Sequence, residues 1–240
     1  MLLLSDIHCD PNALLTWIKK GWRKDIYGEK YCIQLGDFGF WFENKENNLE
    51  EISLNYLEEI LEEHDKILFT ILGNHDCWPR YLKLPTCTDF GFKTWKLRDR
   101  IHAIQPGEVV ELEGKTFLCI GGADSHDKEW RAQYQKEMGV AIWWEEETIT
   151  DTDIKNAWSN LLPRDFKVDF VLSHCPPESF IHKANLYPNP IISNSEKQLE
   201  TVLEIVDFKH WYCGHVHKSA DVEVGGKKIS SLKIDEFMRI

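Results

Sequence analysis

The sequence lacks CxxC pairs, long apolar runs and an excess of basic residues. Its seven cysteines are scattered along the chain, and because their number is odd they cannot all form internal disulfides. Several lie within apolar runs, as Cys119 does in "FLCI", which predicts buried, reduced thiols and a cytoplasmic location. The segment "MLLLSD" has only three apolar residues after Met1, and no later stretch approaches the length of a membrane span. We therefore expect neither a secretory signal nor a transmembrane helix.

Acidic residues outnumber basic ones by 40 to 28, which gives a formal net charge of -12. No surface-wide positive field is available to attract nucleic acid or an anionic membrane, so we expect neither extended nucleic acid nor a membrane as a partner. A phosphate-bearing substrate would have to be held by a local positive centre.

The 240 residues are 42% hydrophobic, which is enough for a substantial core. Short apolar runs alternate with amphipathic patterns, and this alternation predicts an α/β fold in a single domain spanning residues 1–240. Gly-containing turns within apolar segments predict hairpins, so the sheets are expected to be mixed. Strands are expected near residues 2–4, 31–35, 67–72 and 168–172, and hairpin turns at Glu113-Gly114 and Gly225-Gly226.

Amphipathic patterns predict the helices. In segment 48–63, Leu49, Ile52, Tyr56 and Ile60 recur at helical spacing and share one face, with glutamates elsewhere. Further helices are expected from Asp10-Pro11 to near Gly21, from Thr150 to Leu161 or Leu162 before Pro163, and over residues 195–206.

Possible metal ligands follow five of the predicted strands. Functional groups of an open α/β sheet gather just past the carboxyl ends of its strands, so these five turns are expected to meet in one cleft. Segments 38–48 and 175–194 also follow strand ends and are expected to border that cleft. The five turns are "SDIH" with Asp6 and His8, "GDFG" with Asp37, "GNHD" with Asn74 and His75, "SHCPP" with His174, and "GHVH" with His215 and His217.

Each of the five turns alone has an ordinary structural explanation. A single histidine after a strand is more often a hydrogen-bonded core or surface residue than a ligand, and "GDFG" can be a simple turn. In protein kinases the same four letters hold magnesium, but no Gly-rich loop or HRD segment accompanies them in this sequence. The order of the turns and their shared position after strands favour a metal site.

The order D-x-H, GD, GNH[DE], a single His and GHxH resembles that of the calcineurin-like metallophosphoesterases. The resemblance extends from Asp6 to His217, and the opening "SDIHCDPNAL" is similar to the family's SDxHGNxxAL, with Cys9-Asp10-Pro11 in place of a simple Gly. It implies a four-layer α/β/β/α sandwich of two mixed β-sheets flanked by helices. It also suggests one of the bacterial- or phage-type members.

The resemblance further implies a centre of two divalent transition-metal ions with a bridging hydroxide as the nucleophile. Mixed imidazole and oxygen ligands suit Mn, Fe or Zn better than Ca, and we expect Mn. Only two of the ligands are anionic, so the centre would stay net positive and could hold phosphate in an acidic protein. The resemblance assigns Asp6, His8 and His217 to one ion, Asn74, His174 and His215 to the other, and Asp37 to both.

His75 is, by the same resemblance, a catalytic residue and not a ligand. It would face the phosphoryl group and stabilise developing charge or protonate the leaving oxygen. Asp76 either orients that imidazole through a hydrogen bond or is a simple turn cap, and the sequence leaves both open. Gly73 is expected to let the backbone turn tightly beside the metals.

The segment "GGADSHDKEWR", residues 121–131, follows another strand and is similar to a segment of some family members. Asp124, His126 and Arg131 are candidate substrate contacts, with Arg131 as a phosphate clamp. A glycine turn followed by a solvated helix explains the same residues without function.

Two patterns after this segment have plainer explanations than function. Trp143 and Trp144 could stack on a nucleobase, but adjacent tryptophans usually include at least one core anchor. The run Glu145 to Glu147 is interpreted as a solvated face.

The leading hypothesis is a metal-dependent hydrolase of small phosphate esters, with phosphodiesters favoured over monoesters. Asp37 is followed by Phe38 and Gly39 and not by the V-D-R-G-type sequence of the protein Ser/Thr phosphatases, which disfavours phosphoprotein substrates. A nuclease acting on short or single-stranded nucleic acid is the alternative within the same chemistry, although no basic stripe supports it. A non-catalytic protein-binding scaffold on the same fold is disfavoured because all seven ligands are present. The oligomeric state is left open.

Overall fold

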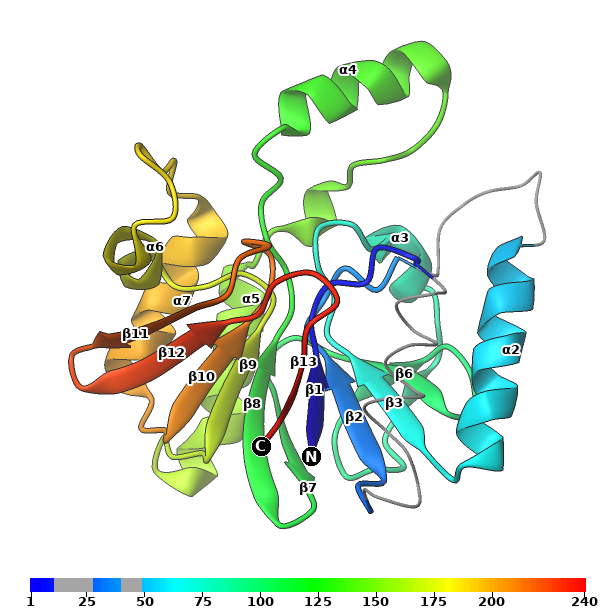
Figure 1. Ribbon diagram of the computed structural model, residues 1–240, viewed down its shortest axis with the longest axis horizontal. Helices are drawn as coiled ribbons and strands as arrows, with labels where there is room; N and C mark the ends of the chain where they lie inside the picture. The colour runs from blue at the N-terminus through cyan, green and yellow to red at the C-terminus, as the bar shows by residue number, and fades with distance from the viewer. Residues whose placement is uncertain (11–27, 40–48) are drawn as a thin grey trace.

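The computed structural model describes residues 1–10, 28–39 and 49–240. Within these ranges, two β-sheets face one another and helices cover their outer faces (Figure 1). The predicted four-layer sandwich of two mixed sheets is therefore confirmed. The helix predicted from Asp10-Pro11 to near Gly21 lies outside the described residues, as does most of segment 38–48.

The first sheet has seven strands in the described part of the chain, in the order β13-β1-β2-β3-β6-β5-β4. The strands from β1 through β2 and β3 to β6 are parallel, whereas both edges pair antiparallel. The strands are β1 (Leu2–Leu4), β2 (Tyr31–Gln34), β3 (Ile67–Thr70), β4 (Thr86–Cys87), β5 (Thr94–Lys96), β6 (Ile101–Ile104) and β13 (Phe237–Arg239).

The second sheet has six strands among the described residues, in the order β11-β12-β10-β9-β8-β7. Both predicted hairpins are confirmed, β7 with β8 and β11 with β12. Their turns place Glu113-Gly114 and Gly225-Gly226 at positive φ, as a two-residue hairpin turn requires. The strands are β7 (Glu108–Leu112), β8 (Lys115–Ile120), β9 (Phe170–Ser173), β10 (His210–Cys213), β11 (Ala220–Val224) and β12 (Lys227–Ser231).

The core consists of three apolar layers, because successive strand residues point to opposite faces. In β1, Leu2 and Leu4 face the helices of the first sheet, and Leu3 faces the second sheet. In β9, Val171 faces the helices of the second sheet, and Leu172 faces the first sheet. The layer between the sheets fixes their relative position and so the position of the loops at their ends.

Six α-helices lie in the described part of the chain. Helices α2 and α3 pack on the first sheet, and α5, α6 and α7 on the second (Figure 1). Helices α5 and α7 begin at capping boxes, Thr150 with Asp153 and Ser193 with Glu196. The helices are α2 (Leu49–Glu63), α3 (Trp78–Tyr81), α4 (Lys128–Met138), α5 (Asp151–Leu161), α6 (Glu178–Ala184) and α7 (Asn194–Ile205), with 3-10 turns η1 (Glu145–Glu147) and η2 (Leu162–Arg164).

Helix α2 is confirmed, but its predicted apolar face is only partly buried: Ile60 packs against the core, whereas two other residues of that face are exposed. Leu54, Leu57 and Leu61 pack into the core, whereas Ile52 is 60% exposed and Tyr56 51% exposed. Both sets of residues recur at helical spacing, so periodicity alone could not choose between the two faces.

Helix α4 projects from the end of the molecule at which the parallel strands end (Figure 1). It has no buried residue, and Trp130 and Tyr134 stack on its exposed surface with ring centroids 5.4 Å apart. The solvated helix predicted after the glycine turn is therefore confirmed. None of the described helices has both the length and the apolar character needed to cross a membrane.

Two sequence expectations about buried side chains are also met. All seven cysteines are unpaired, and all except Cys9 are buried. Trp144 is 7% exposed and belongs to the core of the first sheet, as expected for one of two adjacent tryptophans.

Candidate metal centre

The seven predicted ligands lie just past the carboxyl ends of parallel strands, where both sheets end on the same side of the molecule (Figure 1). The two sheets contribute different ligands, so the site lies on the seam between them. The first sheet supplies Asp6 and His8 after β1, Asp37 after β2 and Asn74 after β3, and the second supplies His174 after β9 and His215 and His217 after β10.

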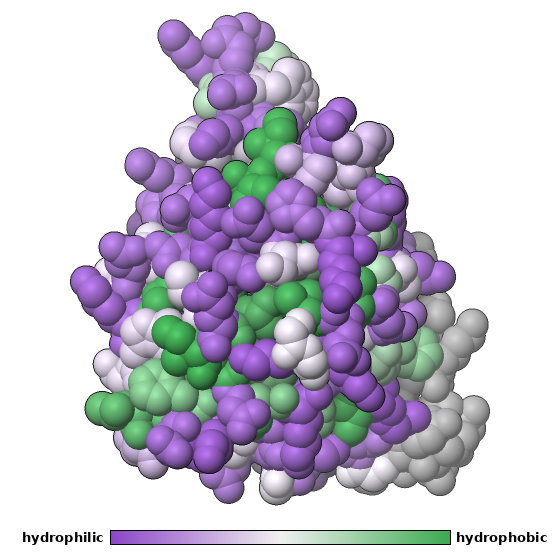
Figure 2. Space-filling model, turned by 90° about the vertical axis from the view of Figure 1, so that its left-hand side faces the viewer, coloured by the Kyte–Doolittle hydropathy of each residue, from purple (hydrophilic) through white to green (hydrophobic). Residues whose placement is uncertain are grey.

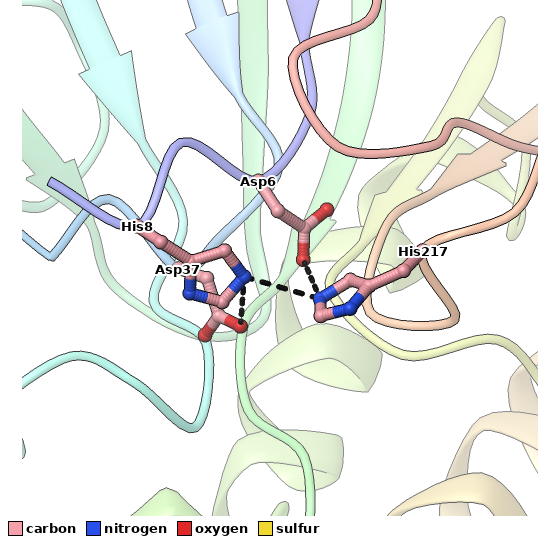
Figure 3. Close-up of side chains that lie close together, drawn as sticks. All are labelled: Asp6, His8, Asp37 and His217. Carbon is pink, nitrogen blue, oxygen red and sulfur yellow. Dashed lines mark hydrogen bonds and ion pairs between the residues drawn. The ribbon is translucent and has the colours of Figure 1, made fainter. Parts of the chain in front are cut away.

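Four of these side chains converge on one point, with one ligand atom from each within 4.8 Å of the others (Figure 3). They are Asp6, His8, Asp37 and His217. His8 Nε2 lies 3.7 Å from Asp37 Oδ2, and His217 Nε2 lies 3.6 Å from Asp6 Oδ1. The Nε2 atoms of the two histidines are 3.1 Å apart. The group consists of the three residues that the family resemblance assigns to one ion, together with Asp37, which it assigns to both.

The other three predicted ligands adjoin this group. His174 Nε2 lies 3.2 Å from Asn74 Oδ1 and 3.3 Å from Asp37 Oδ1. The His215 ring is 5.0 Å from the His174 ring between centroids. Asp37 therefore contacts both groups, as a bridging ligand would. The structure thus brings all seven predicted residues together, whereas their roles as ligands stay a prediction.

The donor atoms of this site fit a cation. His174 Nδ1 donates to the carbonyl oxygen of Leu35 at 2.8 Å, so a neutral His174 has its Nε2 lone pair facing two oxygens. Asp37 Oδ2 is buried and accepts no hydrogen bond from the described residues. A buried acceptor without a partner is costly, so a proton or a metal ion is needed among these atoms.

The charges of the protein groups also favour a positive charge at this site. Burial raises the pKa of the Asp37 carboxyl, but His174 and the other nearby histidines lower it more, and the net shift is downward. Burial lowers the pKa of His174, but Asp37 and Asp6 outweigh it and raise that pKa to about 9. An anionic Asp37 thus attracts positive charge to the middle of the site.

Four of the seven residues have left-handed backbone conformations, which non-glycine residues rarely adopt. They are His8, Asp37, His215 and His217, with φ of 48°, 55°, 65° and 54°. Hydrogen bonds between the turns hold these conformations: the His8 amide donates to the Asp37 carbonyl at 2.9 Å, and the His215 amide to Asp6 Oδ1 at 3.1 Å. Such strain is typical of functional sites.

Two glycines give the ligands room. A side chain at Gly73 would overlap Asp37 Oδ1 and His174 Nε2, and one at Gly214 would overlap the Asp6 carboxylate. Gly73 does not have a positive φ, so close approach and not an unusual backbone turn requires glycine there.

His75 lies beside the candidate metal ligands. Its backbone amide donates to Asp37 Oδ1 at 2.8 Å, and its ring meets the His8 ring edge-on at 4.8 Å. Its Nε2 is 2.9 Å from Nη2 of Arg131. Burial lowers the pKa of His75 to about 4, with Arg131 acting in the same direction and Asp37 against it.

Asp76 does not orient His75 in this structure. Its buried carboxylate accepts hydrogen bonds from the amides of Gly73 and Gly39 at 2.8 Å each, and from Phe38 at 3.4 Å. The turn-cap alternative therefore describes Asp76, which ties together the turns after β2 and β3. Burial and the nearby Asp37 raise its pKa to about 7.

Segment 121–131, which leads into α4, contributes two of its three candidate residues to the site. Arg131 reaches His75, and the His126 ring lies 6.1 Å from the His215 ring between centroids. Asp124 instead accepts hydrogen bonds from Thr148 Oγ1 at 2.9 Å and from Ser195 Oγ at 2.7 Å, so it holds two loops together.

Ser125 and Glu147 support the site and were not predicted. Asn74 Nδ2 donates to Ser125 Oγ at 3.1 Å, which turns Asn74 Oδ1 toward His174. The Ser125 amide donates to Glu147 Oε1 at 2.6 Å. The solvated-face interpretation is wrong for Glu147, which is 1% exposed. Its position in an acidic run gave no signal of this burial.

Comparisons with known proteins identify one family and several structures that are similar to this chain. Residues 1–219 match the model of a family described as calcineurin-like phosphoesterase. A dimetal phosphatase from Danio rerio is similar in structure, with 13% identity and a TM-score of 0.54 over 98% of this chain and 88% of that chain. A phosphopantetheinyl hydrolase from Mycobacterium tuberculosis aligns with 12% identity and a TM-score of 0.43 over 97% of this chain and 89% of that chain. No curated protein is similar enough in sequence to count as a match.

Proposed function

Because the chain belongs to the calcineurin-like phosphoesterase family, we propose that it hydrolyses small phosphate esters at a centre of two metal ions, with phosphodiesters favoured over monoesters. The observation that carries this proposal is the convergence of seven possible ligands around Asp37, which contacts both groups. Two of the seven, Asp6 and Asp37, are carboxylates, so two divalent ions leave a local positive charge in a protein of net charge -12.

The ligand set supports Mn as the bound metal, with Fe or Zn as the other choices. Imidazole nitrogens and carboxylate or amide oxygens suit these ions, and no cysteine is among the seven residues. When bound, two such ions would supply positive charge for the phosphate and lower the pKa of a water, so that hydroxide is available near neutral pH to attack phosphorus.

Arg131 and His75 are the protein groups placed to act on the phosphoryl group. Arginine carries only donors, so in their contact His75 Nε2 accepts and the imidazole proton is on Nδ1. Arg131 would hold a phosphoryl oxygen. His75 would position that guanidinium beside the turn after β3 and would stabilise the charge that develops on the phosphoryl group. Of the two roles predicted for His75, this contact favours charge stabilisation over protonation of the leaving oxygen.

The test is hydrolysis by the purified protein with Mn²⁺, using bis-p-nitrophenyl phosphate, p-nitrophenyl phosphate, cyclic nucleotides and single-stranded DNA as substrates. We expect turnover of the small esters, fastest for the diester, and little for DNA. Turnover of DNA alone would favour a nuclease. No turnover with any divalent metal would overturn the proposal and favour a scaffold.

Metal content separates ligands from the residues that act on the substrate. Asp37→Ala is expected to lose both metal and activity, whereas His75→Ala keeps about two ions per chain and loses most turnover. His182→Ala, an exposed histidine on α6, is the matched control and should change neither. Equal metal loss in the Asp37 and His75 variants would contradict this division of roles.

The proposal includes a cytoplasmic location, which the free and mostly buried thiols support.

A further inference from the structure

A cavity of about 290 Å³ opens beside the candidate metal centre. It lies between the turn after β10, the segment 187–191 that follows α6, and the start of α7. The sequence predicts that segment 175–194 borders the active site, and part of this segment forms a wall of the cavity.

The cavity is continuous with the centre through His215. This residue lines the cavity, and its ring packs 5.0 Å from His174 on one side and 6.1 Å from His126 on the other. A phosphate ester held at the metals would therefore have the cavity as a place for one of its organic groups.

The walls are mostly apolar. Ile181 and Val216 are 4% exposed and form its inner part, whereas Ile191 is 76% exposed and lies at its rim. The side of the molecule formed by α6 and α7 exposes apolar surface among hydrophilic side chains (Figure 2). A group bound there would gain by leaving water.

The charged group in the wall is a buried carboxylate. Glu196 is 2% exposed, and its Oε2 accepts from the Ser193 amide at 2.6 Å as part of the α7 capping box. Burial raises the pKa of Glu196, which means that these surroundings disfavour negative charge, and a second anionic group in the cavity would meet the same penalty. A second phosphate is therefore a poor occupant.

From this geometry we propose that the cavity binds an uncharged, ring-bearing organic group of the substrate. Aryl and other ring-bearing phosphate esters would then be preferred to esters of small polar alcohols and to polyphosphates. An apolar cavity of about 150 Å³ is enough for benzene, so the volume here suits a group of one or two rings. This inference rests on the proposed function, because it places the phosphate at the metals.

The test compares phenylphosphonate with methylphosphonate, which carry the same anionic group but cannot be hydrolysed as esters. Calorimetric titration of the full chain, with and without Mn²⁺, gives the ratio of their Kd values. We expect phenylphosphonate to bind about tenfold more tightly, which is the order of magnitude for burying one ring. Both ligands should need Mn²⁺.

Two substitutions at the rim, Ile191→Asp and Pro190→Asp, test whether the preference comes from this cavity. Each should bring the ratio close to one, because an added carboxylate repels both phosphonates alike but disfavours only the apolar ring. Ile205→Asp is the matched control, since Ile205 is 51% exposed at the end of α7 and does not line the cavity. It should keep the ratio of the unmodified protein.

The outcomes separate this inference from the proposed function. A ratio near one in the unmodified protein, or a ratio that neither rim substitution changes, would overturn the inference and leave the function standing. A phenyl preference without any dependence on Mn²⁺ would support the cavity but contradict the function. No Mn²⁺ dependence and no phenyl preference would overturn both.

Discussion

Nη2 of Arg131 lies 2.9 Å from Nε2 of His75, which joins the projecting helix α4 to the turn that carries Asn74. The two residues are 56 positions apart, and Arg131 also pairs with Asp127 through Nε at 2.7 Å. The guanidinium is therefore held in place before any substrate arrives, with part of its donor set still available.

Removing this guanidinium is expected to impair turnover without loss of metal. Arg131→Ala should lower kcat/KM for the small diester by about 100-fold, the magnitude typical of one lost donor to transition-state charge. Steady-state kinetics and metal analysis check this. Lys136→Ala on the same helix should leave both unchanged. Metal loss in Arg131→Ala would instead indicate a structural role.

The hydrogen bond from Asn74 to Ser125 predicts an effect on metal affinity. Ser125→Ala leaves the amide of Asn74 without its partner, so the carboxamide is free to rotate away from His174. Partners of this kind typically change metal affinity by about 10- to 100-fold, and we expect about tenfold weaker binding at one of two sites. Metal titration monitors the change, with Ser159→Ala on the exposed side of α5 as the control. Unchanged affinity would contradict the orienting role.

The buried Glu147 predicts a pH dependence of stability. Burial raises its pKa from 4.5 to about 7, and the hydrogen bond from the Ser125 amide only partly opposes this. Below pH 4.5 both folded and unfolded chains bind the proton; between 4.5 and about 7 only the folded chain keeps it, so stability falls with rising pH.

Glu147→Gln removes this titration and should keep the bond from Ser125. Relative to the unmodified protein, the variant should gain unfolding free energy as pH rises from 4.5 to about 7, by at most about 3 kcal/mol. Denaturant titrations across this range measure the difference, and the exposed Glu146→Gln serves as control. A difference that stays constant with pH would contradict the prediction.

The left-handed backbone of His217 predicts that glycine at this position gives a more stable protein than alanine, although either substitution removes a candidate metal ligand. In protein treated with a chelator, His217→Gly should unfold with about 1 kcal/mol more free energy than His217→Ala, because only glycine adopts this φ without strain. The same pair of substitutions at His182, within helix α6, should show the opposite order. Equal stability of the two His217 variants would show that this conformation carries no strain.

The meeting of the candidate ligands could be predicted from the sequence because their positions depend on local features. Each follows an apolar strand, and parallel strands carry their carboxyl ends to one side of a sheet, so Asp6, Asp37 and His174 meet once the strands are identified. The same reasoning predicted both hairpins, whose turn residues determine the conformation.

The parts that failed depend on partners distant in the chain. The Asp76 carboxylate binds amides of its own turn and of the turn after β2, and nothing in "GNHD" distinguishes these partners from the His75 ring. Glu147 is buried because the Ser125 amide binds it, although its neighbours in the acidic run are exposed. Helix α2 has two apolar stripes, and only the position of the sheet selects the buried one.

The seam position of the candidate centre has a thermodynamic consequence. Because the candidate ligands come from both sheets, a cation bound to them would link the two sheets across the apolar layer between them. Separating the sheets would then require release of the cation, so the free energy of unfolding would depend on the free concentration of the cation. At a free concentration 100 times Kd, one such ion adds about 2.7 kcal/mol to stability. Metal supply would thereby affect the stability of the fold as well as the activity of its site.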